Sequence, residues 1–419
     1  MDAGAEQAKD FAVQLPTQLR PMPEPVASGS AEVGFKIRGT KGWNWTAEQY
    51  LQEIPTLVAG KMNFLMNCYL SMYSDPKGYK NEWWLPIPDA KKQAYAEVIQ
   101  ACRKAGIQFC FAMHPQLHSP RPLDPTSNED FEKFYAHFAW AQSQGVQWFC
   151  VPLDDIGGVR IDPAEHARFV NKLLARLREK DPNSQLIFCP THYWGDGTAA
   201  GDRPYLETLG RELHPDVYLF WTGPDVCSLR ITRQQAETFK SIVKHRLILW
   251  DNYPVNDASP TLHLGPITGR DPELPQVADG YMSNPMCPQN QINRIPLLTC
   301  ADYAYNPPGY DPARSIGQAI WHLAETENQR RVLKDLVEAY PGYLVYRQKR
   351  TDLNGVREQF KAISQQPDAR VSARAYIQDL QDLLMRLPKE FPDRYQDAAA
   401  TLRQDIEWLE RAYEGKYGQ

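Results

Sequence analysis

Residues 128–155 read NEDFEKFYAHFAWAQSQGVQWFCVPLDD, and this stretch decides the fold. Its first half has acidic residues at the start and apolar residues at helical spacing, which predicts a helix. Gly145 is typical of a helix C-terminus, and the apolar run 146–152 that follows predicts a buried strand. Two acidic residues, Asp154 and Asp155, come soon after that strand. The stretch therefore predicts a helix–strand unit that ends in two carboxylates.

The same kind of unit recurs along most of the chain. Further apolar runs predict strands at 32–37, 61–69, 107–112, 185–189, 216–221, 246–250 and 279–282. Helical patterns lie between most of them, at 46–59, 89–105, 163–179, 203–212 and 231–243. Alternating strands and helices predict a parallel sheet, and eight units over about 250 residues favour a closed (β/α)8 TIM-type barrel over a doubly wound open sheet. We expect this α/β barrel to occupy residues 31–306.

The two ends of the chain differ from the barrel region. Residues 307–419 carry helical patterns with no strand between them, which predicts an α-helical C-terminal domain. Residues 1–30 are rich in Pro, Gln, Ala and Glu and are predicted to form a flexible leader. The first residues lack the apolar segment of a signal peptide. The sequence is compatible with a secreted or periplasmic chain whose signal peptide has been removed, and otherwise with a cytoplasmic one.

The amino-acid composition argues against some binding partners and favours others. The 419 residues carry a net charge of −5, which argues against nucleic acid, and no apolar run is long enough to span a membrane. The 11 Trp and 21 Tyr residues favour a carbohydrate substrate because flat rings stack on sugars, although core packing accounts for most of them. The eight cysteines form no C-x-x-C pair and are predicted to be buried free thiols. The oligomeric state stays open.

In barrels of this kind, catalytic residues lie at the C-terminal ends of the strands. The residues that follow the predicted strands include acids, amides, Tyr and Trp, which are the side chains of a glycosidase-like site. We single out Asp154 and Asp155 as catalytic residues, and as substrate-binding residues Gly39, Tyr193, Trp221, Trp250, Asn252, Asp257 and Asn284.

Asp154 and Asp155 form the most specific of these patterns. Neighbouring residues of a strand point to opposite faces, so both carboxylates can face one ligand only if the backbone leaves strand geometry there. Two close carboxylates push their pKa values apart, so that one stays charged while the other holds a proton, as general acid catalysis requires. The alternative is structural: one of the acids caps the helix at 163–179 or pairs with an Arg of the barrel.

We expect no metal and no cofactor at this site. His114 and His118 have the spacing of metal ligands on a helix, but Pro115 makes a continuous helix there unfavourable. The sequence also lacks glycine-rich phosphate-binding motifs and the G-x-S-x-G motif of a serine nucleophile.

Six short stretches around the candidate residues resemble glycoside hydrolase family 84, which contains the O-GlcNAcases and bacterial β-N-acetylglucosaminidases. They occur in the same order and at similar spacing from about residue 33 to residue 306, and the W-T-G-P and W-D-N-x-x-x-N-D motifs are the most specific. The stretches are 149–156, 188–193, 221–224, 250–257, 264–266 and 283–285. A barrel followed by a helical domain is also the layout of this family.

The resemblance implies a retaining exo-β-N-acetylhexosaminidase that uses substrate-assisted catalysis through an oxazoline. Asp154 would then polarise the acetamido N–H of the substrate, and Asp155 would protonate the leaving oxygen and later act as the base. The family further implies a hydrogen bond near the acetamido group for Tyr193, contact with the N-acetyl group or a nearby hydroxyl for Asn252, a wall of the acetamido pocket for Trp250, and hydroxyl binding for Asp257 and Asn284.

Two segments depart from the family pattern. Arg38 stands where the family has an acid, and the stretch 66–72 lacks the sugar-binding Lys that the family has after the second strand. One interpretation is a changed specificity, for GalNAc or for a GlcNAc with a 3-O-substituent such as lactyl, with Arg38 as the added charge. The other is that a neighbouring side chain such as Asn67 supplies the missing hydrogen bond. A barrel that binds carbohydrate without turnover is a further alternative, against which the acid pair argues.

Overall fold

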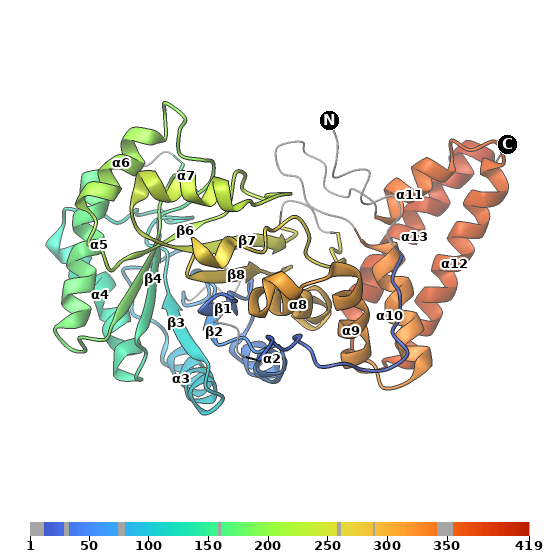
Figure 1. Ribbon diagram of the computed structural model, residues 1–419, viewed down its shortest axis with the longest axis horizontal. Coiled ribbons are helices and arrows are strands. Elements are labelled where there is room, and N and C mark those ends of the chain that lie inside the picture. Colours follow the sequence, from blue (N-terminus) through green and yellow to red (C-terminus); the bar gives the residue numbers. More distant parts are fainter. Residues whose placement is uncertain are drawn as a thin grey trace.

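The computed structural model describes residues 12–28, 33–73, 80–157, 161–257, 261–287, 290–341 and 355–418. Eight parallel strands form a closed barrel in sequence order, and the first strand pairs with the last. Helices surround the barrel, and a separate group of C-terminal helices stands at one side of it (Figure 1). The predicted (β/α)8 barrel with a helical C-terminal region is therefore confirmed.

The strands are short and their side chains are almost all buried. They are β1 (Ile37–Thr40), β2 (Phe64–Met66), β3 (Gln108–Ala112), β4 (Trp148–Pro152), β5 (Gln185–Cys189), β6 (Tyr218–Trp221), β7 (Arg246–Pro254) and β8 (Gly280–Asn284). Helices cover the outside of the barrel and side chains of the other strands fill its inside. A parallel sheet buried on both faces gives continuous apolar runs, which is why most strands could be found in the sequence.

The ring around the barrel consists of α2 (Ala47–Ala59), α3 (Asp89–Lys104), α4 (Asn128–Ser143), α5 (Pro163–Arg178), α6 (Arg203–Glu212), α7 (Arg233–Val243) and α8 (Asn290–Tyr305). Local sequence fixes several helix starts. The Ser127 and Asp162 side chains accept hydrogen bonds from backbone N–H groups in the first turns of α4 and α5. Thr46 and Thr232 start α2 and α7 with reciprocal capping boxes.

The first strand lies further along the chain than predicted. The sequence indicates a strand over 32–37, whereas β1 covers Ile37–Thr40 and pairs there with β2 and β8. Gly39 has low strand propensity, which hides the strand in the sequence. The position nevertheless requires glycine, because a Cβ at Gly39 would lie 2.1 Å from the carbonyl oxygen of Phe64 on β2. Close approach of the two strands thus overrides propensity.

Helix α8 lies outside the predicted helices. Its interior contains Pro296, which removes one backbone hydrogen bond, and most of its residues are buried, so it lacks the polar face of a surface helix. The burial has a simple cause: α8 packs against the barrel on one side and against the C-terminal helices on the other.

The C-terminal helices are α9 (Pro312–Leu323), α10 (Glu327–Ala339), α11 (Val356–Ile363), α12 (Ala369–Glu390) and α13 (Gln396–Tyr417). Their hydrophobic core also includes Leu262 and Leu264 from the loop after β7 and Met286 from the segment after β8. The backbone N–H of Leu264 donates to the carbonyl of Tyr340 at 2.9 Å. The helical region therefore supports two segments at the C-terminal end of the barrel.

Residues 12–28 belong to the predicted flexible leader, and the rest of that leader lies outside the described residues. They run as an extended segment beside α8, α9 and α10 (Figure 1). The backbone N–H of Val13 donates to Glu338 at 2.9 Å, and that of Glu24 donates to Asp302 at 2.7 Å. Acceptors on the helices thus hold this part of the segment, an interaction that composition does not reveal.

The cysteines are as the sequence predicts: all eight are free thiols, and all except Cys287 are buried. Within the described part of the chain, we find no helix that is both long enough and apolar enough to cross a membrane.

Candidate active site

A cavity of about 680 Å³ lies at the C-terminal end of the barrel. All eight strands, or the segments directly after them, contribute to its lining, as expected for an active site in this fold. The cavity brings together both predicted acids, Asp154 and Asp155, and five of the predicted substrate-binding residues: Tyr193, Trp250, Asn252, Asp257 and Asn284.

The acid pair lies in a sharp backbone turn after β4. Asp155 has a φ of 53°, in the left-handed region that residues with a Cβ rarely adopt. The chain therefore leaves strand geometry where the sequence predicts that it must, and both acids line the cavity. This conformation costs roughly 1–2 kcal/mol for a residue other than glycine, so the surrounding structure has to hold it.

His114, just after β3, holds this turn. Its Nδ1 accepts hydrogen bonds from the backbone N–H groups of Gln116 and Leu117 at 3.1 and 3.0 Å, so the ring proton lies on Nε2. Nε2 then donates to the backbone carbonyl of Asp154 at 2.9 Å. Burial lowers the pKa of His114 to about 4, which keeps the ring neutral at physiological pH. His114 therefore positions the peptide group that joins the two acids.

Asp154 is the buried member of the pair, with 5 % of its surface exposed. Tyr69, after β2, donates to its Oδ2 at 3.3 Å, while Oδ1 has no hydrogen-bond partner among the described residues. Burial raises the pKa of Asp154 to about 6, and the ammonium group of Lys41 acts against that rise. Asp154 thus has one buried carboxylate oxygen without a hydrogen bond, 3.6 Å from Nε2 of His114.

Asp155 faces the open part of the cavity and is exposed. Tyr193, after β5, donates to its Oδ1 at 3.0 Å. Desolvation within the cavity, followed by the negative charge of Asp154, raises the pKa of Asp155. The two acids titrate as a coupled pair: Lys41 and Tyr69 favour the ionised form of Asp154, and the charge of Asp154 favours the protonated form of Asp155.

A β-bulge in β7 brings Asn252 to the cavity. Asp251 and Pro254 pair with consecutive residues of β8, so the two residues between them bulge out of the ladder. The Asn252 side chain donates to the carbonyl of Val226 at 2.6 Å and accepts from Nδ2 of Asn284 at 2.8 Å. Bulges often redirect a side chain near an active site. Here the bulge turns the Asn252 amide toward the cavity, where it is hydrogen-bonded to the Asn284 amide.

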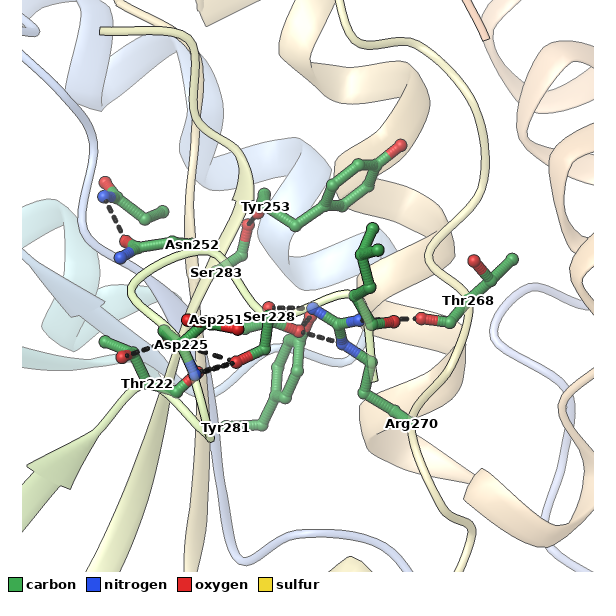
Figure 2. Close-up of polar contacts among 12 residues, drawn as sticks. Thr222, Asp225, Ser228, Asp251, Asn252, Tyr253, Thr268, Arg270, Tyr281 and Ser283 are labelled. Carbon is green, nitrogen blue, oxygen red and sulfur yellow. Dashed lines mark hydrogen bonds and ion pairs between the residues drawn. The ribbon is translucent and has the colours of Figure 1, made fainter. Parts of the chain in front are cut away.

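A buried ion pair supports the bulge from behind. Figure 2 shows the Asp251 carboxylate facing the Arg270 guanidinium, with Asn252 on the other side of the strand. Arg270 donates to this carboxylate from Nη2 at 2.5 Å and from Nε at 2.8 Å. It also donates to the backbone carbonyls of Leu229 and Thr268 at 3.1 and 2.8 Å. Arg270 therefore ties the loops after β6 and β7 to the strand that carries Asn252.

Lys41 is a cavity residue that no sequence pattern singles out. Its side chain is buried, and Nζ has no hydrogen-bond partner among the described residues. With the first strand predicted at 32–37, Lys41 appears as one residue of a glycine-rich loop. The observed β1 ends at Thr40, so Lys41 stands directly at the C-terminal end of a strand. Correct strand bounds would have marked it as a site residue.

Two predicted substrate-binding residues do not line the cavity. Gly39 lies within β1, against the backbone of β2. Trp221 turns outward from the end of β6: its Nε1 donates to the carbonyl of Gly195 at 2.8 Å, and its ring stacks on Phe239 of α7 with centroids 5.4 Å apart. The next residue, Thr222, lines the cavity instead. Gly39 and Trp221 therefore make packing contacts, and a role of either residue in substrate binding stays a prediction.

Arg38 and Asn67, the two residues considered for a changed or compensated sugar contact, are also absent from the cavity lining. Arg38 donates to the backbone carbonyls of Lys61 and Phe35 at 3.0 and 2.6 Å and is absent from the cavity lining. The structure therefore lends no support to Arg38 as the added charge for a substituted sugar. Asn67 is buried, and its amide accepts from the Ala112 N–H at 2.9 Å and donates to the Ala112 carbonyl at 2.8 Å. Its hydrogen bonds are committed to the barrel.

The histidine spacing noted in the sequence does not lie on a helix. His118 has a φ of 56°, and His114 is committed to the acid turn. In the ranges that the structure describes, no three His, Cys, Asp or Glu side chains are grouped so that they could hold a metal ion.

A closed parallel barrel with neighbouring carboxyl, amide and aromatic side chains at its C-terminal end defines a TIM-barrel protein with a glycosidase-type site. The sequence profile of the beta-N-acetylglucosaminidase family matches residues 36–338, which span the barrel and continue through most of α10. The chain belongs to this family of glycoside hydrolases, and the resemblance drawn from the sequence is confirmed.

Curated relatives agree with this assignment. The Protein O-GlcNAcases of Rattus norvegicus and Mus musculus are each 26 % identical to this chain over 277 residues, which cover 64 % of this chain and 29 % of the relative. The chain thus spans less than a third of the length of these relatives.

Solved structures share the fold. An O-GlcNAc hydrolase mutant from Thermobaculum terrenum superposes with a TM-score of 0.73 at 24 % identity, over 91 % of this chain and 82 % of that one. The structure of CpGH84B superposes with a TM-score of 0.67 at 23 % identity, over 91 % of this chain and 67 % of that one.

Proposed function

We propose that this protein is an exo-acting β-N-acetylhexosaminidase that cleaves β-linked N-acetylglucosaminides by a retaining, substrate-assisted mechanism. One observation carries the proposal: four buried polar atoms of cavity residues lack hydrogen-bond partners within the described part of the chain. They are Lys41 Nζ, Asp154 Oδ1, Trp250 Nε1 and Asn284 Oδ1. Buried polar atoms are normally hydrogen-bonded, so two donors and two acceptors in one cavity match a ligand that offers both, such as a 2-acetamido sugar.

In the proposed first step, the carbonyl oxygen of the substrate's acetamido group attacks C1 while the bond from C1 to the leaving oxygen breaks. The Asp154 carboxylate accepts the acetamido N–H and stabilises the positive charge that develops on the oxazolinium. Its buried Oδ1, which has no hydrogen-bond partner among the described residues, would accept this bond. The nucleophile is part of the substrate, which removes the entropic cost of bringing it to C1.

Asp155 supplies the proton that the leaving oxygen takes up. It then accepts a proton from the water that opens the oxazoline, so that the same residue serves as acid and base. Its exposed position fits contact with a leaving group that extends out of the cavity. Tyr193, hydrogen-bonded to Oδ1, orients the carboxyl group for both proton transfers.

Turnover of 4-nitrophenyl β-glycosides of GlcNAc, GalNAc and glucose tests this proposal. We expect cleavage of the GlcNAc glycoside and none of the glucoside, because glucose has no acetamido group to attack C1. A thiazoline that mimics the oxazoline should inhibit competitively. Equal turnover of glucoside and GlcNAc glycoside, or insensitivity to the thiazoline, contradicts the mechanism. Binding of sugar without turnover of any of the glycosides indicates a carbohydrate-binding protein instead.

The acid pair also predicts a bell-shaped pH dependence of kcat/KM. Asp154 must be ionised to act, so activity falls as the pH drops through the lower apparent pKa of the pair, which burial raises. Asp155 must hold a proton, so activity falls again as the pH rises past the upper apparent pKa of the pair, which burial and the charge of Asp154 raise. Initial rates with the aryl GlcNAc glycoside between about pH 4 and about pH 9 check this expectation. A profile without the acid limb would contradict the role of Asp154.

A further inference from the structure

The ammonium group of Lys41 sits in a cage of three aromatic rings. Its Nζ lies 3.8 Å from the ring centroid of Trp43, 4.6 Å from that of Tyr69 and 4.9 Å from that of Trp250. The ring faces stabilise a cation, but they accept no ordinary hydrogen bond. An ammonium carries three N–H donors, and Nζ has no hydrogen-bond partner in the described part of the chain. Those donors are therefore unspent, on a residue that lines the cavity and whose Nζ is buried beneath the rings.

Lys41 is also the one Lys or Arg side chain of the described residues that lines the cavity. Three carboxyl groups share the cavity with it, those of Asp154, Asp155 and Asp257. Even with a proton on Asp155, the two remaining carboxylates outnumber the single ammonium. An anionic substituent on the sugar would add a further negative charge to this set, whereas a hydroxyl oxygen offers lone pairs to Nζ without a net charge.

We propose that Lys41 is a specificity-determining residue that donates hydrogen bonds to a ring hydroxyl of a neutral 2-acetamido sugar, an inference that rests on the proposed function. Lys41 reaches the cavity from the end of β1, whereas the side-chain amide of Asn67 makes its hydrogen bonds within the barrel. The cage keeps the charged side chain in place before the sugar enters. When the sugar binds, its hydroxyl oxygen accepts a hydrogen bond from Lys41 Nζ, which has no acceptor among the described residues.

Monodeoxy analogues of the aryl GlcNAc glycoside, lacking the 3-, 4- or 6-hydroxyl, test this inference together with Lys41→Met. Methionine fills a similar volume but has neither charge nor N–H donors. We expect the wild type to lose about 10- to 100-fold in kcat/KM on one of the three analogues, mainly through KM. Lys41→Met should show the same loss on the parent glycoside and no further loss on that analogue. Lys36→Met, an exposed Lys that lies 3.7 Å from Asp279, is the matched control and should leave all values unchanged.

The comparison separates three outcomes. An equal loss by Lys41→Met on the parent and on every deoxy analogue would mean that Lys41 acts through Asp154 and would overturn hydroxyl recognition. Faster turnover of a 3-O-carboxyalkyl or 6-sulfated analogue than of the parent would overturn the preference for neutral sugars. If Lys41→Met does not fold, uniform wild-type rates on all three deoxy analogues would still contradict the inference. Failure of the proposed function is visible separately, as absence of turnover of the parent by the wild type.

Discussion

Asp155→Asn is expected to lower kcat by about 10²- to 10⁴-fold, the usual contribution of a positioned general acid. The amide keeps the shape of the side chain and a hydrogen bond with Tyr193, so binding of a thiazoline should persist. The loss should depend on the leaving group. A 4-nitrophenolate leaves without a proton, so the first step should suffer less with that substrate than with a phenyl or alkyl glycoside. Measurement of kcat and KM for a series of leaving groups, with thiazoline binding measured in parallel, checks this result.

Asp181→Asn is a suitable control because it makes the same chemical change at the opposite end of the barrel. Asp181 lies before β5, where it accepts a hydrogen bond from Gln147 at 2.8 Å. This variant should keep wild-type kcat. Asp154→Asn provides the contrast within the site, since its loss should be similar for all leaving groups. An Asp155→Asn protein that retains more than about a tenth of wild-type activity on phenyl glycosides would not be compatible with an acid role for Asp155.

The acid pair could be predicted because its cause is local. A buried strand followed by two neighbouring acids forces the backbone either to separate their side chains or to turn, and the φ of Asp155 shows that it turns. The support of that turn could not be predicted. His114 comes from a different strand, and its role depends on three hydrogen bonds that meet only when the barrel closes.

Lys41 is missed because the first strand is predicted too early in the chain. Gly39 weakens the sequence signal of β1 while it meets a packing requirement of the barrel, so Lys41 falls in a predicted loop although it lines the cavity. Trp221 stands at a strand end, as a site residue should, but α7 offers its ring an apolar partner and Gly195 offers its N–H an acceptor. Spacing identifies strand ends, whereas the direction of each side chain is decided by neighbours distant in sequence.

Arg270→Met is expected to lower the free energy of unfolding by about 3–5 kcal/mol, because it leaves the Asp251 charge buried without its partner. The two side chains are 1 % and 0 % exposed, so water cannot replace the lost ion pair. The hydroxyl of Tyr281, which donates to Asp251 at 2.9 Å, remains as a partner. Denaturant unfolding monitored by fluorescence measures the loss. The control is Arg246→Met, whose half-exposed pair with Asp279 at 3.2 Å should be worth less than about 1 kcal/mol. Equal losses for both variants would contradict a structural role for the buried pair.

The reciprocal variant and the double variant extend this prediction. Asp251→Asn leaves a buried guanidinium that stays charged at every usable pH, so it should also lower the free energy of unfolding. Asp251→Leu combined with Arg270→Met removes both charges and should recover much of the stability. It should not recover kcat/KM, because the bulge that presents Asn252 begins at Asp251. Recovery of both stability and activity would instead mean that the bulge needs only the volume of these two side chains and not their charges.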